Sequence, residues 1–239
     1  MMLCLDAGNS RLKYGLFGGD GWLVQGSLKY GALGELPERL PATPERLIIC
    51  NVAGAAVATE LEALAGSFRL EPEWFSSSHS SCGVTNGYAL PKQLGADRWA
   101  ALIGARGIHS GAALVVMSGT ATTIDALDAG GNFSGGVIIP GLNLMHRSLA
   151  SGTAGLPLAD GNIVAFPRNT VDAITSGAVQ ATLGAIERIA GQLFAGTKDA
   201  DNLCLVSGGA ADVLAPHLQI RCRVVPNLVL EGLARYGQR

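Results

Sequence analysis

The chain of 239 residues lacks several features that would assign it to common classes of protein. No apolar run approaches the roughly 20 residues that a membrane-spanning helix needs, although hydrophobic residues make up 48% of the chain and charged residues only 15%. Lysine and arginine form no cluster, and the formal net charge of −2 gives no electrostatic reason to bind nucleic acid. We therefore expect neither a membrane nor a nucleic-acid partner.

Cysteine and aromatic residues are also sparse. The five cysteines are widely spaced, include no Cys-x-x-Cys pair and lie mostly in apolar stretches, which indicates reduced thiols rather than a metal or redox site. No signal peptide precedes the first expected strand at residues 2–7, so we expect a cytoplasmic protein. By contrast, 33 glycines indicate the tight turns and close helix-to-sheet packing of an α/β protein.

One short pattern occurs twice in the chain. Residues 3–10 (LCLDAGNS) are an apolar stretch that runs into a small polar turn, and residues 114–121 (LVVMSGTA) repeat this layout. The residues after each turn alternate like a second strand, so each turn is predicted to be the tip of a β-hairpin. Two such turns facing each other across a cleft would hold a polyphosphate from both sides.

This repeat predicts two similar domains, at residues 1–110 and 111–239. The best-supported helix spans residues 170–195, where an apolar stripe follows the candidate cap Asn169. Further strands are predicted at 11–17, 21–28, 46–52, 113–118, 122–128, 132–139, 203–206 and 221–225, and further helices at 54–65, 95–106, 141–150, 209–217 and 228–236.

The first turn carries residues suited to binding phosphate. Asp6 ends a strand and could hold a metal-bound water, while the amides and hydroxyl of residues 8–10 could bind phosphate oxygens. Arg11 and Lys13 are the nearby cations. An ordinary hairpin would use the same residue types, but the echo of this turn at residues 119–122 favours a functional role.

Two further groups of residues could carry chemistry. Tyr88 precedes residues 95–98 (GADR), in which Asp97 could be either the N-cap of a helix or a base that deprotonates an alcohol, with Arg98 binding an anionic substrate group. The run at residues 207–209 (SGG) follows an apolar strand, where its glycines could admit a nucleotide or simply allow close helix packing.

Taken together, the motifs resemble those of the type III pantothenate kinase family, in the same order and across nearly the whole chain. The matching motifs are Asp6-x-Gly8-Asn9-Ser10, Gly95-x-Asp97-Arg98, residues 119–123 (GTATT), Gly135-Gly136 to Pro140-Gly141, Asn169-Thr170 and residues 207–209. The resemblance implies an α/β fold of duplicated actin-like (ribonuclease H-like) domains, as in the sugar kinase, Hsp70 and actin superfamily. It also implies a homodimer and the ATP-dependent phosphorylation of pantothenate, the first step of coenzyme A synthesis.

The resemblance also assigns roles to matching positions. Asp97 is similar to the general base that takes the proton from the pantothenate hydroxyl, and Asp6 to the acid that positions magnesium, directly or through water. The ATP-binding positions are Asp6, Ala7, Gly8, Asn9, Ser10, Arg11, Leu12, Lys13 and Thr120. The pantothenate-binding positions are Tyr88, Gly95, Ala96, Asp97, Arg98 and Thr170, the last across the dimer interface.

The chain departs from the family at one position. Relatives usually carry an aspartate two residues before the glycine of the second turn, where it binds potassium or ammonium, but this chain has Met117. Because a thioether is a poor ligand for a hard cation, we expect monovalent-cation dependence to be weak or to use other ligands. Met117 also keeps open a non-catalytic accessory role, whereas Asp6, Asp97 and Arg98 favour an enzyme, either this kinase, a kinase of another small alcohol or a phosphohydrolase.

Overall fold

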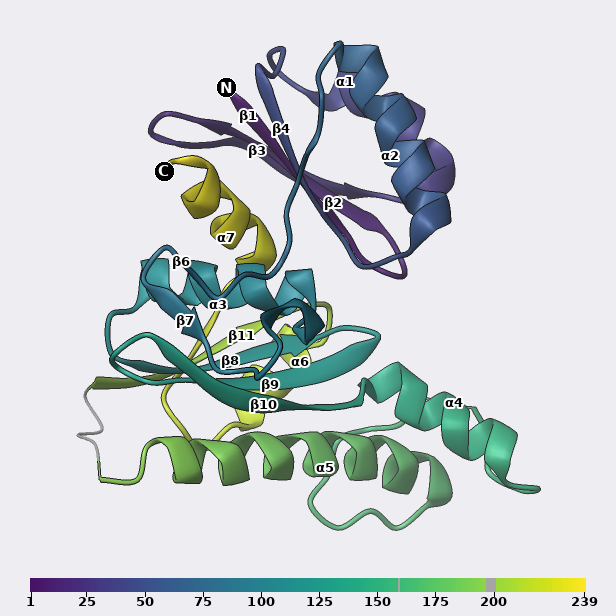
Figure 1. Ribbon diagram of the computed structural model, residues 1–239. Helices are drawn as coiled ribbons and strands as arrows, with labels where there is room; N and C mark the ends of the chain where they lie inside the picture. Colours follow the sequence, from purple (N-terminus) through teal and green to yellow (C-terminus); the bar gives the residue numbers. More distant parts are fainter. Residues whose placement is uncertain (159, 197–200) are drawn as a thin grey trace. The chain divides into compact units, whose positions relative to one another are not determined.

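The computed structural model describes residues 1–158, 160–196 and 201–239. The chain divides into two compact units, which Figure 1 shows as ribbons. Unit 1 comprises residues 1–110, 131–133 and 227–239, and unit 2 comprises residues 111–130 and 134–226. The sequence prediction placed residues 111–239 in one domain, whereas the last segment of the chain belongs to unit 1.

Five strands form a sheet in unit 1. In order across the sheet they are β3 (Gly21–Leu28), β2 (Leu12–Gly18), β1 (Met2–Ala7), β4 (Arg46–Asn51) and β5 (Glu73–Trp74). Strands β1 and β2 are antiparallel, with Ala7 opposite Leu12, while β1 and β4 are parallel. The predicted hairpin at the first turn is therefore confirmed.

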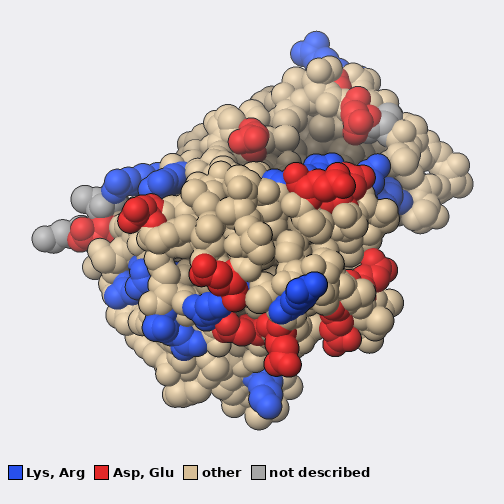
Figure 2. Space-filling view, turned by 90° about the horizontal axis from the view of Figure 1, so that it is seen from above, with Lys and Arg blue, Asp and Glu red and all other residues tan. Residues whose placement is uncertain are grey.

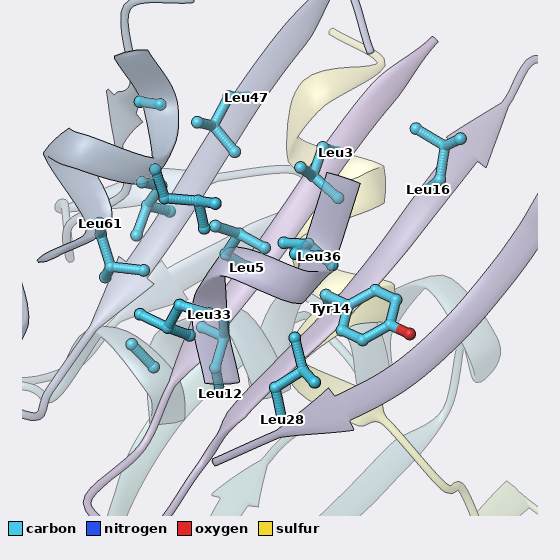
Figure 3. Packing of buried hydrophobic residues seen from close by; sticks show 14 residues of the cluster. Leu3, Leu5, Leu12, Tyr14, Leu16, Leu28, Leu33, Leu36, Leu47 and Leu61 are labelled. Carbon is cyan, nitrogen blue, oxygen red and sulfur yellow. The ribbon is translucent and has the colours of Figure 1, made fainter. Parts of the chain in front are cut away.

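The two faces of β1 carry different side chains, because successive residues of a strand point to opposite faces. Leu3, Leu5 and Ala7 belong to a buried apolar cluster with side chains of β2, β4 and α2 (Ala55–Phe68), much of which is labelled in Figure 3. The 3₁₀ turn η1 (Tyr30–Glu35) and the short helix α1 (Leu36–Arg39), which the sequence analysis did not predict, also contribute to this cluster. Asp6 belongs to the opposite face of β1.

Two helices of unit 1 come from distant parts of the chain. Helix α3 (Ala96–Ile108) packs against α7 (Leu228–Gly237), which brings the C-terminal segment into this unit. All residues from Arg98 to Ala105 are buried. Such all-round burial is why α3 shows little of the polar face that marks a surface helix.

A small strand pair precedes α3. Strands β6 (Ser80–Ser81) and β7 (Val84–Asn86) are antiparallel, and a 3₁₀ turn, η2 (Pro91–Gln93), follows β7. Strand β7 also pairs in parallel with the first two residues of β10 (Asn132–Pro140), which belong to unit 1. The loop that carries Tyr88 is thus anchored to a strand at one end and runs toward α3 at the other.

Five strands lie side by side in unit 2, in the order β12 (Cys222–Val224), β11 (Asn202–Ser207), β8 (Ala112–Ser118), β9 (Ala121–Leu127) and β10. Strands β8 and β9 are antiparallel, with Ser118 opposite Thr122, so the second predicted hairpin is also confirmed. Its turn has three residues, 119–121, whereas the first turn has four, 8–11. The repeat is therefore one residue shorter in its second copy.

The helices of unit 2 are α4 (Leu142–Gly152), α5 (Thr170–Leu193) and α6 (Ala211–Leu214), the last followed by the 3₁₀ turn η4 (Ala215–His217). Helix α5 packs apolar residues such as Val179 and Ile186 against Leu114 and Val116 of β8. The predicted cap is confirmed, because the Asn169 side chain accepts a hydrogen bond of 2.8 Å from the Asp172 amide. Within the described residues, no helix combines the length and apolar character needed to cross a membrane.

Candidate active site

The first turn presents polar residues at the end of the β1–β2 hairpin. Gly8 is half-buried, whereas Asn9, Ser10 and Arg11 are exposed, so their amides and side chains are accessible to a ligand. The Tyr30 hydroxyl donates a hydrogen bond to the Gly8 carbonyl, which ties η1 to the turn. Sequence reasoning missed Tyr30, because nothing in the local pattern around it indicates a contact with a turn 22 positions earlier.

Asp6 is a buried carboxylate next to this turn. Its residue is only 7% exposed and lies opposite Lys13 in the β1–β2 pairing. The pKa of the Asp6 carboxyl is raised to about 6, chiefly because burial disfavours its charged form, while the charge of Lys13 opposes the shift and that of Asp97 adds to it. A carboxylate in this state gains from a nearby cation, so Asp6 is suited to holding a metal ion or its bound water.

Asp97 lies in the first turn of α3. The structure shows that Gly95 is the N-cap, so the interpretation of Asp97 as the cap is wrong; instead, its Oδ1 accepts a hydrogen bond of 2.9 Å from the Arg98 amide. A Cβ atom on residue 95 would lie 2.6 Å from Oδ1, so a side chain there would require the carboxylate to shift. Asp97 is half-buried and close enough to Asp6 for their charges to interact.

Arg98 is buried beside two aromatic rings. Its Nη1 donates a hydrogen bond of 3.0 Å to the Tyr88 hydroxyl, and its Cζ lies 5.7 Å from the Tyr88 ring centre and 5.8 Å from that of Phe133. The two rings are themselves in contact, with their centres 5.4 Å apart. The predicted pairing of Tyr88 with residues 95–98 is therefore a direct contact, while Phe133, inside a predicted strand, was not recognised as its third member.

The second turn belongs to unit 2. The Gly119 amide donates a hydrogen bond to the Ala121 carbonyl, and the Gly141 amide donates one to the Thr120 carbonyl; both bonds are 3.0 Å long. Thr120 is exposed, whereas Met117, two residues before the glycine, is half-buried. This turn accordingly offers an accessible hydroxyl and backbone amides but has no carboxylate where the first hairpin has Asp6.

The glycine run at residues 207–209 has a structural explanation. Gly208 has a φ of +98°, and a Cβ atom there would lie 2.3 Å from the Ser118 carbonyl oxygen, at the start of the second turn. The Ala210 amide donates a hydrogen bond of 3.2 Å to the same oxygen. These contacts favour close packing, which was one of the two alternatives, as the reason for Gly208.

The predicted site residues thus fall into two groups. Unit 1 contains Asp6 to Lys13, Tyr88 and Gly95 to Arg98, whereas unit 2 contains Thr120 and Thr170, the exposed first residue of α5. Among the described residues, no cluster of three or more histidine, cysteine or acidic side chains could by itself enclose a metal ion. A lone carboxylate beside a phosphate turn instead fits a magnesium ion that takes its other ligands from phosphates and water.

Comparisons with known proteins point to one family. A model of the family described as type III pantothenate kinase matches residues 2–192. The chain is 49% identical to the type III pantothenate kinase of Dechloromonas aromatica, over 98% of this chain and 97% of the relative. It is 48% identical to the protein of the same name from Aromatoleum aromaticum, over 98% and 96% respectively.

Solved structures show the fold. A crystal structure from Campylobacter jejuni, of a protein named for the Baf family of transcriptional activators, has a TM-score of 0.61 at 21% identity and covers 99% of this chain and 97% of that one. MreB5 of Spiroplasma citri, solved with ADP, has a TM-score of 0.51 at 10% identity, over 99% and 96%. At such identities the likeness concerns the fold alone, which is the predicted actin-like fold of the sugar kinase superfamily.

Proposed function

The chain belongs to the type III pantothenate kinase family, and we propose that it catalyses the phosphorylation of pantothenate by ATP. The observation that carries this proposal is the family match along the chain, together with a half-buried Asp97 beside the Tyr88–Arg98 pair. The product would be 4′-phosphopantothenate, the first intermediate of coenzyme A synthesis. The proposal places the enzyme in the cytoplasm, in keeping with five free cysteines.

Asp97 is the proposed catalytic base. Its carboxylate takes the proton from the primary hydroxyl of pantothenate as the hydroxyl oxygen attacks the γ-phosphorus of ATP, and ADP leaves. The hydrogen bond from the Arg98 amide orients Asp97 Oδ1. Supporting this role, Gly95 leaves room for the carboxylate, so that the base is held in place before the substrate binds.

The first turn is the proposed phosphate side of the site. Asp6 would hold magnesium, directly or through water, and the cation would supply positive charge that neutralises the transferring phosphoryl group. The amides of residues 8–11 and the Lys13 side chain bind phosphate oxygens, with Ala7 and Leu12 completing the hairpin. Thr120 contributes from the second turn.

Pantothenate binding is assigned to Tyr88, residues 95–98 and Thr170. Arg98 is suited to the pantothenate carboxylate because planar guanidinium groups match carboxylate geometry. Tyr88 orients that guanidinium through its hydroxyl. Binding of potassium or ammonium is proposed to be weak or to use other ligands, because Met117 lacks the oxygen that such a cation prefers.

We also propose that the protein acts as a homodimer. Unit 2 exposes large apolar side chains along α4 and the segment that leads to Thr170; these are Leu144, Leu149, Leu158, Val164 and Phe166, with exposed fractions from 37% to 90%. Such concentrations of exposed apolar surface mark interaction sites. A second copy is the proposed partner, because this segment ends at Thr170, which the family resemblance assigns to the site of the neighbouring subunit.

Steady-state kinetics test the proposed function. The wild-type protein should release ADP in a pantothenate-dependent manner, and Asp97→Asn should abolish the formation of phosphopantothenate while ATP binding and the fold persist. Asp20→Asn is the matched control, since Asp20 is an exposed carboxylate of unit 1 in another turn. A panel of small alcohols and water as acceptors distinguishes the alternatives; absence of any pantothenate-dependent turnover by the wild type would refute the proposal.

A further inference from the structure

Asn86, at the end of β7, is a buried side chain that bonds to three points of its surroundings. Its Nδ2 donates hydrogen bonds of 3.2 Å to the carbonyls of Ser78 and Pro91, and its Oδ1 accepts one of 3.0 Å from the Tyr88 amide. Only 3% of the residue is exposed. Both donor hydrogens and the acceptor of the amide are thus used, so the side chain fixes the start, the middle and the end of one loop.

This loop carries the residue that contacts the candidate substrate-binding arginine. Tyr88 has its backbone amide held by Asn86 and its hydroxyl bonded to Arg98. Phe133, which packs on Tyr88 and lies beside Arg98, is the register partner of Asn86 across the β7–β10 pair. Asn86 therefore supports Tyr88 directly and sits on the strand pair that positions Phe133.

The hydrogen bonds of Asn86 extend beyond its own turn. An asparagine that only closes a turn bonds to the backbone within a few residues, whereas Asn86 also reaches Ser78 on the far side of β6. The Tyr88 hydroxyl receives a hydrogen bond from Arg98, so the position of this hydroxyl follows the position of the Tyr88 backbone that Asn86 holds.

We propose that Asn86 is a positioning residue for pantothenate. It does not touch the substrate but acts through Tyr88 and through the bond of Tyr88 to Arg98. This inference rests on the proposed function and adds a residue to it. One hydrogen bond of Asn86 holds the Tyr88 amide and the other two hold the flanking segments, the Tyr88 hydroxyl bonds to the Arg98 guanidinium, and the guanidinium receives the pantothenate carboxylate. Without Asn86, the loop from residue 87 to 90 loses these bonds, and the Tyr88 hydroxyl loses its fixed position against Arg98.

A double-mutant cycle tests the inference. Asn86→Ala and Tyr88→Phe should each raise the KM for pantothenate about tenfold, because an interaction that fixes a charged hydrogen-bonding group affects binding on that scale. The KM for ATP should change by less than about twofold in both variants. If Asn86 acts through Tyr88, the double variant should show about the same tenfold increase, whereas independent effects would multiply to about a hundredfold.

The controls separate positioning from folding. Asn202→Ala removes an asparagine of unit 2 that is also buried, at 5% exposure, so it should lower the melting temperature without changing either KM selectively. If Asn86→Ala does not fold, Asn86→Ser replaces it, because the hydroxyl and a water in the vacated space can still bond to the loop carbonyls.

The outcomes are distinguishable. Multiplicative effects in the double variant, or equal changes of both KM values in Asn86→Ala, would overturn the inference while the proposed kinase activity stands. A wild-type protein without pantothenate-dependent ADP release would overturn the proposed function and, with it, this inference. A non-multiplicative increase confined to pantothenate would support both.

Discussion

Gly95 lies so close to the Asp97 carboxylate that a side chain on residue 95 would require the carboxylate to move. A Cβ on residue 95 would lie 2.6 Å from Oδ1 of Asp97, the same oxygen that accepts the hydrogen bond from the Arg98 amide. The identity of residue 95 therefore controls the position of the carboxylate proposed as the base.

Gly95→Ala should displace that carboxylate and lower kcat. Because displacements of about 1 Å in an active site can cost about a hundredfold in rate, we expect a decrease between about tenfold and a hundredfold, with the KM for ATP little changed. A discontinuous assay that measures phosphopantothenate at fixed times would show this decrease in kcat. Gly66→Ala is the control, since a Cβ on this residue of α2 meets no atom within 4 Å; an unchanged kcat in Gly95→Ala would contradict the assigned role.

The raised pKa of Asp6 predicts a pH dependence of stability. The pKa rises from 3.8 to about 6 on folding, so between these values the native state binds a proton that the unfolded state does not. The free energy of unfolding therefore falls as the pH rises from about 4 to about 6, and the part of this fall that Asp6 causes is about 3 kcal/mol. Asp6→Asn should accordingly be more stable than the wild type at pH 8 and similar at pH 4, in the absence of ligands.

The same shift predicts a pH dependence of activity. Protonated Asp6 cannot hold a cation, so activity should fall as the pH drops below about 6, and the apparent pKa of this fall should decrease as magnesium is raised. Rate profiles at several magnesium concentrations measure this effect.

Chemical unfolding of the wild type and of Asp6→Asn between pH 4 and pH 8 measures the effect on stability. Equal stability of wild type and Asp6→Asn at every pH would show that the carboxylate is not destabilised by burial.

Met117 predicts activity that does not require potassium. Met117 lies opposite Thr123 in the β8–β9 pairing. The buried Thr123 hydroxyl has no hydrogen-bond partner among the described residues. Wild-type rates should agree within about twofold in potassium, ammonium and sodium chloride at equal ionic strength, while Met117→Asp should become faster in potassium because it adds an oxygen ligand. Strict potassium dependence of the wild type that maps to this site would contradict the prediction.

Phe166 predicts an interface between two copies of the chain. It is 90% exposed, so Phe166→Asp should cost little stability but should dissociate a dimer of 24.5 kDa chains. Analytical ultracentrifugation measures the mass, and Leu23→Asp, at an apolar residue of unit 1 that is 53% exposed, is the control. A wild-type protein that sediments as a monomer at micromolar concentration would end the dimer proposal.

Charged side chains of both signs lie on the face that Figure 2 shows, where most of the surface is uncharged. This mixture is consistent with the formal net charge of −2.

Prediction from the sequence succeeded where the signal is local. Alternating apolar residues around a polar turn predicted both hairpins, and Asn169 three residues before Asp172 predicted the helix cap. It failed at η1 and α1, which are too short to show a periodic pattern, and at the proposed helix over 209–217, which is divided between α6 and η4. Asp97 was assigned two possible roles, and the backbone angles at the start of α3 exclude only that of the N-cap.

The sequence by itself determined that two hairpins exist, that their turns are polar and that the first has an acid which the second replaces with Met117. Those properties depend on residues adjacent in the chain. Only the tertiary structure decided that Asn86 holds Tyr88, that Phe133 packs beside Arg98 and that residues 227–239 complete unit 1. The physical reason is that burial, pKa and side-chain contacts depend on which distant segments pack together, and no local pattern encodes that choice.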